Sequence, residues 1–304
     1  MRKIDFSNYY IGNYQKYLLD YDFDYYGILE DNINSSNKNR TIINIKSGAC
    51  VIFEKLNWDS NILGVTCAKA EIVFIDKKRG NTYGEPVKII KAYCIKENIS
   101  FISVRFPFDN FFLYNELEKH GFKTTDVLNT YLFIKNQSVI NINYNADACA
   151  KKGSLKNLNK VFDIAKNAFR YSRIYNDQNI SQDRADEFYF KLTESIVKKN
   201  DYFTTVEVED EIAGFCIGTI DKRIKKISKK KIGYLWLIAV APEKKGLGYG
   251  KLLFSDFLKN FSEKVDYIEI STQINNFPAN RLYSSFELKN VANIVTMHYW
   301  SGIK

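Results

Sequence analysis

The chain has 304 residues, of which 45% are hydrophobic and 26% are charged, and its formal net charge is +9. This length predicts about two domains, and the composition is that of a globular protein rather than a disordered one. The charge favours an anionic ligand, but the sequence has no zinc-finger, RNA-recognition or other nucleic-acid motif, and no apolar run approaches the roughly 20 residues of a membrane span. We therefore expect neither nucleic acid nor a membrane as a partner.

Cysteines and histidines give no sign of a disulfide frame or a metal site. The five cysteines lie far apart and form no Cys-x-x-Cys pair; they are Cys50, Cys67, Cys94, Cys149 and Cys216. This pattern favours reduced thiols in a cytoplasmic protein. With only His120 and His298, histidine-based metal chemistry is not expected. The basic start of the chain leads into no apolar core of signal-peptide length.

The first half of the chain is expected to fold as an α/β unit. Residues 1–30 carry seven tyrosines. Their three-to-four spacing predicts one or two helices packed on a core, with sugar stacking as the alternative. The elements that follow are a polar loop over 31–40, a strand over 70–75, a charged turn over 76–86, a helix over 87–97, a strand over 99–106, a helix over 108–120 closed by Gly121, and a strand over 127–134.

The second half is expected to begin within residues 135–148, which are poor in apolar residues and rich in asparagine. We therefore predict two domains, 1–140 and 141–304. The elements expected in the second are helices over 155–169 and 182–199, hairpin strands over 202–208 and 212–220, strands over 234–240 and 267–272, a helix over 275–286 and closing strands over 291–300.

A basic run precedes the strand over 234–240. Residues 221–231 carry seven lysines and arginines. Such runs are usually solvated hairpin tips, and contact with an anionic nucleotide is the alternative.

The stretch from Tyr234 to Val240 is an uninterrupted apolar and aromatic run that includes β-branched residues, which predicts a strand buried on both faces. Pro242 ends it, because proline has no N–H for strand pairing. After a glycine-rich turn comes a helical stripe formed by Leu253, Phe254, Phe257, Leu258 and Phe261. Glycines adopt left-handed torsions cheaply, and the first N–H groups of a helix lack intrahelical partners, so a pyrophosphate can bind at such a turn.

Two other kinds of phosphate loop are excluded by single positions. A P-loop would need Gly at position 245, where the chain has Lys245. It would also need Ser or Thr at position 252, where the chain has Leu252. A dinucleotide-binding fingerprint reads Gly-x-Gly-x-x-Gly. Its third glycine is replaced by Lys251 when the pattern starts at Gly246, and by Leu253 when it starts at Gly248.

The segment from Lys245 to Gly250 resembles the acetyl-CoA loop of the GNAT N-acetyltransferases, which reads Gln or Arg, two residues, Gly, one residue, Gly or Ala. Here Lys takes the first place. The resemblance implies a GNAT fold with a mixed central sheet, preceded by a smaller, partial GNAT-like α/β domain, with acetyl-CoA as cosubstrate and no metal. The cofactor-binding residues that it implies are Ile238, Ala239, Val240, Lys245, Gly246, Leu247, Gly248, Tyr249, Gly250, Lys251 and Asn276. A glycine-rich turn without a ligand is the alternative.

A second motif runs from Asn276 to Tyr283 and resembles the family's Asn-x-x-Ala-x-x-Leu-Tyr helix. The resemblance implies that Asn276 holds the CoA arm and that Tyr283 is the catalytic acid, since a phenol is protonated at neutral pH. The chain departs from the family at Glu287-Leu288, where Gly-Phe is usual. The alternative for Tyr283 is an aromatic residue on a buried helix face.

Short segments resemble the dTDP-fucosamine acetyltransferase group of this family. They are the stretch from Leu56 to Gly64, Gly121-Phe122 with Asp126, and the stretch from Ser172 to Tyr175. The resemblance implies the amine of a dTDP-4-amino-4,6-dideoxyhexose as acceptor, for a surface polysaccharide. It implies that Asp126 is a catalytic residue near the sugar amine. It also implies that the sugar or its diphosphate is bound by Arg170, Arg173 and Tyr175.

Several alternatives stay open. Asp126 could be a turn residue before a strand. The acceptor could be another amino sugar, a polyamine, an antibiotic or a peptide, and the protein could instead be a non-catalytic CoA-binding module or a basic nucleic-acid binder. A homodimer is also open. Leu113-Tyr114 and Leu282-Tyr283 indicate either a degenerate internal duplication or two unrelated amphipathic helices.

Overall fold

The computed structural model describes residues 38–45, 49–74, 83–135, 148–155 and 158–302, with a few single positions before residue 32. The chain divides into two compact units: unit 1 comprises Met1–Leu128 and Ala292–Lys304, and unit 2 comprises Asn129–Val291. The expected helices over 1–30, loop over 31–40 and boundary over 135–148 lie mostly outside the described residues. The domain limits 1–140 and 141–304 therefore stay predictions.

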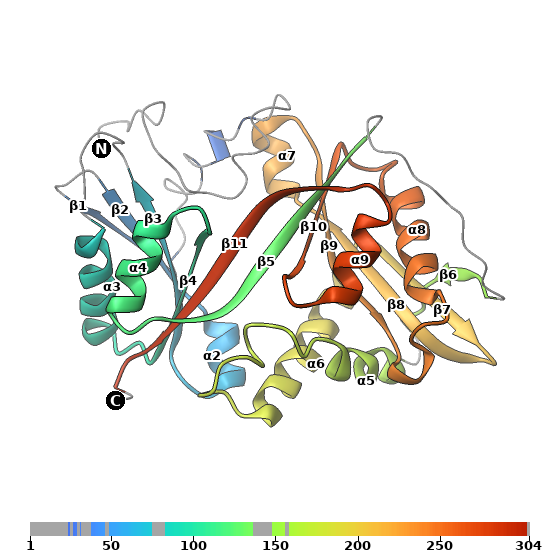
Figure 1. Cartoon of the computed structure of the whole chain (residues 1–304), viewed down its shortest axis with the longest axis horizontal. Helices are drawn as coiled ribbons and strands as arrows, with labels where there is room; N and C mark the ends of the chain where they lie inside the picture. Colours follow the sequence, from blue (N-terminus) through green and yellow to red (C-terminus); the bar gives the residue numbers. More distant parts are fainter. Residues whose placement is uncertain are drawn as a thin grey trace. The chain divides into compact units, whose positions relative to one another are not determined.

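Unit 1 is a sheet that packs against helices α3 (Gly84–Lys96) and α4 (Phe111–Lys119) (Figure 1). Its strands are, in spatial order, β1 (Arg40–Ile45), β2 (Ala49–Lys55), β3 (Cys67–Phe74), β4 (Phe101–Pro107), the Ala292–Trp300 part of β11 (Lys289–Trp300) and the Lys123–Leu128 part of β5 (Lys123–Ile134). From β1 to β11, β3 and β4 pair in parallel and the other neighbours are antiparallel. A short helix, α2 (Asn57–Leu63), connects β2 to β3 and ends at Gly64, which has left-handed torsions.

The strands of unit 2 are also mixed in direction. Its strands are, in spatial order, the Asn129–Ile134 part of β5 (Lys123–Ile134), β10 (Tyr267–Gln273), β9 (Ile232–Val240), β8 (Glu211–Ile220), β7 (Tyr202–Val208) and β6 (Ala150–Lys152). The β9–β10 pair is parallel, and β6 to β9 are antiparallel neighbours. The expected mixed sheet is confirmed.

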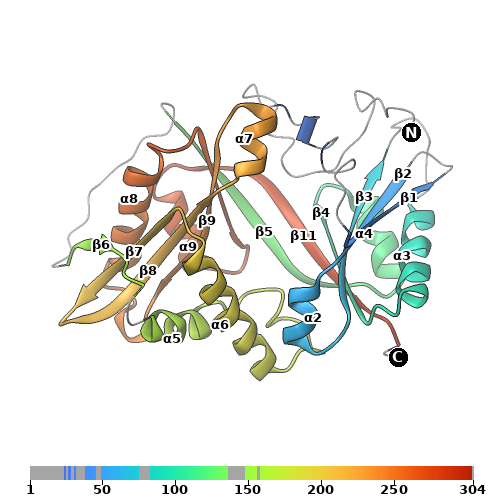
Figure 2. The ribbon, with the colours of Figure 1, turned by 180° about the vertical axis from the view of Figure 1, so that it is seen from behind.

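Helices cover both faces of the unit 2 sheet (Figures 1 and 2). The α8-side core contains α8 (Tyr249–Phe261) and α9 (Phe277–Ser284), with strand residues that include Leu235, Ile268 and Ile270. The α5-side core contains α5 (Asn159–Ala168) and α6 (Gln182–Lys198), with strand residues that include Phe215, Leu237 and Ala239.

The aromatic stripe of α8 fits because the strands beneath it carry glycines. All five predicted stripe residues are fully buried. A Cβ at Gly218 would lie 2.6 Å from Cε2 of Phe257, and a Cβ at Gly233 would lie 2.4 Å from Cε1 of Phe261. Burying such rings contributes about 2 kcal/mol each. Gly218→Ala would therefore force the Phe257 ring out of its present position.

The two halves of the chain repeat one topology. The order β3-α3-β4-α4-β5 in the first half matches β9-α8-β10-α9-β11 in the second. In both runs the first two strands are parallel neighbours. The last strand of each run ends in the other unit, β5 beside β10 and β11 beside β4. This shared order favours internal duplication over chance similarity of two helices.

Three expectations were wrong in detail. Residues 221–231 do not form a hairpin tip but contain helix α7 (Lys222–Ser228), which buries Ile224 and begins where Oδ1 of Asp221 accepts from the Ile224 N–H at 2.9 Å. The closing strands are one long strand, β11. Strands β1 and β2 were not predicted, although both are rich in isoleucine, valine and other strand formers.

Candidate active site

Strand β9 leaves its neighbour β10 halfway along its length. Their parallel pairing ends at Leu235 and Ile270, although β9 continues to Val240 and β10 to Gln273. On the other side β9 stays paired with β8 up to Val240. The main-chain groups of residues 236–240 that point toward β10 are therefore outside this ladder. They are suited to hydrogen bonding an extended ligand.

A bulge lies at the point of divergence. Ile217 pairs with Leu237 and Gly218 with Leu235, so Trp236 is the extra residue. Trp236 is 49% exposed, so the prediction of a strand buried on both faces was wrong at this position. Ile238 and Val240 are also only partly buried, whereas Ala239 packs into the α5-side core.

The glycine-rich loop has the expected backbone. Pro242 begins a short 3₁₀ helix, η3 (Pro242–Lys244). Gly246 and Gly248 then take left-handed torsions, with φ of 81° and 84°. Gly248 caps α8, whose first intrahelical bond runs from the Leu252 N–H to the Gly248 carbonyl at 3.0 Å. The preceding N–H groups, at Tyr249, Gly250 and Lys251, remain for a ligand.

The start of α8 meets both the end of β9 and helix α9. A Cβ at Gly250 would lie 3.8 Å from Cγ2 of Val240 and 4.0 Å from Cδ2 of Leu282. Within the loop, Leu247 is 54% exposed and Lys245 is also exposed, whereas Lys251, in the first turn of α8, is partly buried. The loop and the end of β9 thus lie next to the second motif.

The side chain of Asn276 makes structural hydrogen bonds within unit 2. It is the N-cap of α9, where its Oδ1 accepts from the Ala279 N–H at 3.4 Å. Its Nδ2 donates to Oγ1 of Thr272 at 3.0 Å. These contacts do not provide the expected contact with the CoA arm, which stays a prediction.

Tyr283 lies on α9 with 3% of its surface exposed. Its ring packs edge-on to Tyr131, with centroids 5.6 Å apart, and tilted against Phe254, with centroids 5.0 Å apart. Burial, followed by the neighbouring Cys216 and Tyr131, raises the pKa of the Tyr283 phenol well above its usual value. The phenol is therefore protonated at every pH near neutrality.

Asn280 connects α9 to two strands, a role that no local sequence pattern indicates. Its Oδ1 accepts from Nδ2 of Asn129 at 2.8 Å and from the Tyr131 hydroxyl at 2.9 Å. Its Nδ2 donates to the Gln273 carbonyl at 2.9 Å. The residue thereby fixes the helix of Tyr283 against β5 and β10.

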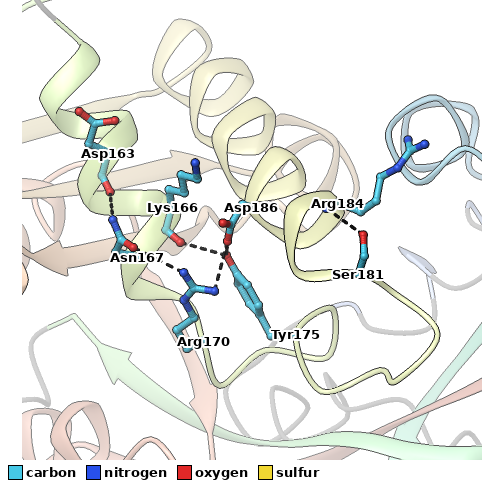
Figure 3. Close-up of polar contacts among 8 residues, drawn as sticks. All are labelled: Asp163, Lys166, Asn167, Arg170, Tyr175, Ser181, Arg184 and Asp186. Atoms are coloured by element: carbon cyan, nitrogen blue, oxygen red, sulfur yellow. Dashed lines mark hydrogen bonds and ion pairs between the residues drawn. The ribbon is translucent and has the colours of Figure 1, made fainter.

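Two predicted substrate residues are committed to a network between α5 and α6 (Figure 3). The Arg170 guanidinium lies 3.2 Å from Oδ1 of Asp186 and 4.6 Å above the ring of Tyr175. The Tyr175 hydroxyl donates to the same carboxylate and to the Lys166 carbonyl. Burial and the hydrogen bond to Asp186 raise the pKa of Tyr175. The geometry gives Arg170 and Tyr175 a structural role, and their contact with a diphosphate stays a prediction.

Arg173 and Asp126 are the remaining predicted site residues. Arg173 is partly buried in the connection between α5 and α6. Asp126 is 7% exposed inside β5, so its reading as a turn residue was wrong. It belongs to unit 1, whereas Tyr283 belongs to unit 2. Its role as a base stays a prediction.

The cysteines all carry free thiols, four of them buried and Cys149 exposed. Across the described ranges, no group of three or more His, Cys, Asp or Glu side chains could hold a metal ion. None of the described helices is long and apolar enough to cross a membrane.

Comparison with known proteins finds a family match within the second half of the chain. Residues 158–287 match the model of the Acetyltransferase (GNAT) family. No curated protein matches the chain. A GCN5-related N-acetyltransferase from Sphaerobacter thermophilus superposes with a TM-score of 0.59 at 13% identity, over 86% of this chain and 84% of that chain.

Two further solved structures share the fold. A tandem GNAT protein from the clavulanic acid biosynthesis pathway gives a TM-score of 0.53 at 9% identity, over 91% of this chain and 88% of that chain. A GCN5-related glucosamine N-acetyltransferase region of a fungal multi-domain β-N-acetylglucosaminidase gives 0.58 at 9% identity, over 83% of this chain and 31% of that chain. The expected α/β GNAT fold is confirmed.

Proposed function

We propose, starting from the match of residues 158–287 to the GNAT acetyltransferase family model, that the protein moves the acetyl group of acetyl-CoA to the amine of a nucleotide-linked amino sugar. The enzyme class and the use of acetyl-CoA belong to the family, and the acceptor is the proposed part. The observation that carries the site assignment is the divergence of β9 from β10 beside the left-handed glycines of the loop.

The residues present fit acetyl-CoA. The free N–H groups at the start of α8 and the positive charge of Lys245 suit its pyrophosphate. The main-chain groups of Ile238 and Val240 suit its pantetheine arm and acetyl carbonyl. When bound, acetyl-CoA supplies a thioester whose carbonyl carbon an amine can attack directly.

Tyr283 is the proposed donor to the departing sulfur. Because burial raises the pKa of its phenol, Tyr283 is a weaker acid than an exposed tyrosine but a permanent hydrogen-bond donor. Its role is to stabilise the thiolate, to which the proton passes as the C–S bond breaks.

The amino-sugar acceptor, a dTDP-4-amino-4,6-dideoxyhexose used for a surface polysaccharide, is supported by the resemblances around Trp58 and Arg173. The likeness in fold to a glucosamine N-acetyltransferase region is compatible with it. Asp126 is the base that this resemblance proposes, and Arg173 the residue for the sugar or its diphosphate.

Calorimetry with acetyl-CoA, followed by mass spectrometry of products from a panel of nucleotide-linked amino sugars, tests this function. We expect binding of acetyl-CoA and a mass increase of one acetyl group on a 4-amino-4,6-dideoxyhexose. No binding would remove the whole assignment, and acetylation of a different amine would replace the acceptor.

A non-catalytic CoA-binding module is the second candidate, because Tyr283 is packed in the core. Binding of acetyl-CoA without transfer to any tested amine, together with an unaffected Tyr283→Phe variant, would favour it.

A further inference from the structure

We propose that residues 221–231, which comprise helix α7 and the turn after it, bind the surface of a membrane that is rich in anionic phospholipid. The binding surface, the α7 face, consists of the six lysines and one arginine of this run. The inference goes beyond the proposed acetyl transfer and does not depend on it. It concerns a basic run for which the candidate active site has no use.

The α7 face carries most of the net charge of the chain. Its seven basic residues and one acidic residue, Asp221, give a formal charge of +6, against +9 for all 304 residues. The positive charge is therefore concentrated on one short segment rather than spread over the molecule. Such a patch attracts a polyanion through its local field.

The lysines of the α7 face point into solvent and have few acidic partners. On the helix itself Ile224 is buried, so α7 has an inner and an outer side. Four lysines of the run are exposed: Lys222, Lys225, Lys226 and Lys229. Among the described residues, the run has one ion pair, between Lys222 and Asp201 at 3.8 Å, and the Lys222 side chain is 83% exposed. A pair of this kind is weak.

The aspartates at the same end of the sheet are engaged with the main chain. Each of the three accepts a hydrogen bond of 2.8–2.9 Å from a main-chain N–H group: Asp201, Asp221 and Asp266. These bonds hold the ends of β8, α7 and β9 in place. Most of the lysine charge is therefore left to ions or to an external partner.

The α7 face lies far from the glycine-rich loop. It precedes β9 (Figure 2), whereas the loop follows the other end of that strand. From Ile232 to Val240 the strand rises about 3.3 Å per residue, which separates the two by about 26 Å. The lysines of the run therefore do not serve the pyrophosphate of acetyl-CoA.

The composition of the face favours lipid head groups over nucleic acid. Residues 221–231 include no aromatic side chain on which a base could stack. They include one arginine, the residue type that pairs bidentately with phosphates and with guanine, whereas lysines act as compact point charges. A helix that carries a cluster of roughly four to eight basic residues is typical of proteins that bind anionic lipid.

The expectation that no membrane takes part rests on the lack of an apolar run long enough to span one. Electrostatic binding at a surface needs no such run. Because Ile224 is buried within the protein, the association we propose is peripheral, without insertion of α7 into the lipid. It should therefore weaken as salt is added, since the Debye length falls from about 10 Å at about 0.1 M salt to about 3 Å at about 1 M.

Vesicle flotation with the full-length protein is the test. The probes are vesicles of phosphatidylcholine alone and of an equimolar mixture of phosphatidylcholine and phosphatidylglycerol. The variant changes Lys225, Lys226 and Lys229 to Gln, and the matched control changes Lys88, Lys96 and Lys123, exposed lysines of unit 1, to Gln. Both variants lose the same net charge, and glutamine keeps the helix propensity of lysine.

We expect the wild-type protein to bind the mixed vesicles and not those of phosphatidylcholine alone. A lysine near an anionic surface strengthens binding about fivefold, so the α7 variant should bind about 100-fold more weakly and the control about as tightly as wild type. If the α7 variant is unstable, Lys229→Gln, which lies outside the helix, decides: an about fivefold loss supports the proposal and no loss overturns it.

No binding of the mixed vesicles by the wild-type protein would overturn the proposal, as would an equal loss in both triple variants. Tighter binding of a DNA or RNA duplex than of the mixed vesicles, lost in the same α7 variant, would overturn it in favour of nucleic acid. Since acetyl-CoA takes no part in the assay, these outcomes leave the proposed acetyl transfer unaffected.

Discussion

Asn110 and Asn276 cap two helices in the same way. Oδ1 of Asn110 accepts from the Leu113 N–H at 3.2 Å, and Oδ1 of Asn276 accepts from the Ala279 N–H at 3.4 Å. Each cap follows a strand that pairs in parallel with the preceding strand of its run. Seven residues after each cap stands a buried side chain, Leu117 in α4 and Tyr283 in α9. The helices are therefore equivalent, and only α9 carries a phenol there.

The sequence repeats at the phosphate loop as well. Gly-x-x-Tyr-Gly occurs at 80–84 and at 246–250, each time after a basic residue. Together with the shared element order, this favours duplication of one ancestral unit. The copy in unit 1 has lost the phenol, so we assign the chemistry to unit 2.

Tyr283→Phe is expected to lower kcat about tenfold or more while the Kd for acetyl-CoA changes little, because only the donor to sulfur is lost. Tyr114→Phe, the same change on helix α4, is the control and should leave kcat unchanged. Steady-state kinetics with calorimetry checks both variants. Unchanged turnover in Tyr283→Phe would leave the phenol as a core residue only.

Gly248→Ala and Gly250→Ala form a matched pair. At Gly248, with φ of 84°, a side chain adds strain of about 1–2 kcal/mol, and we expect weaker binding of acetyl-CoA. At Gly250 a Cβ meets only ordinary contacts at 3.8 Å or more, and alanine should stabilise the helix by about 1 kcal/mol. Calorimetry and thermal unfolding measure both effects. Equal affinities in the two variants would contradict the loop assignment.

Asn280→Ala should destabilise the protein by about 1–3 kcal/mol, since it leaves the Tyr131 hydroxyl without its Asn280 acceptor and removes the side-chain donor to the Gln273 carbonyl. Urea unfolding measures the loss. Asn260→Ala is the comparison, because Asn260 lies on the exposed side of α8 and bonds only within its own helix. A similar, small loss in both variants would argue against a linking role for Asn280.

Local patterns predicted much of this fold, and contacts across the chain account for what they missed. The stripe of α8 and the left-handed Gly246 and Gly248 follow from neighbouring residues alone. The bulge at Trp236 depends on the register of β8, which no local pattern specifies. The ion pair of Arg170 depends on Asp186, which lies 16 residues later in helix α6. No pattern in the neighbouring sequence indicates that contact.

The Arg170–Asp186 pair should stabilise the fold more than it binds substrate. In a double-mutant cycle of Arg170→Gln and Asp186→Asn we expect a coupling energy of about 1 kcal/mol, reduced by the partial exposure of the guanidinium. Each single variant should lower the thermal midpoint and leave the acceptor KM unchanged. A higher acceptor KM in Arg170→Gln with an unchanged midpoint would return Arg170 to the substrate site.

Alkaline pH should weaken the fold through its buried thiols. Burial and the charge of Glu71 raise the pKa of Cys50 to about 12, and burial alone raises that of Cys94 to about 12. The folded protein then holds protons that the unfolded chain releases above about pH 9, so each thiol lowers the free energy of unfolding by about 1.4 kcal/mol per pH unit between these values. Below about pH 8 the contribution is constant. Urea unfolding at about pH 8 and pH 10 should show a smaller decrease in Cys50→Ala than in wild type, while Cys149→Ala, whose thiol is exposed, keeps the full decrease. A Cys50→Ala variant with the wild-type decrease would show that this thiol does not set the alkaline limit.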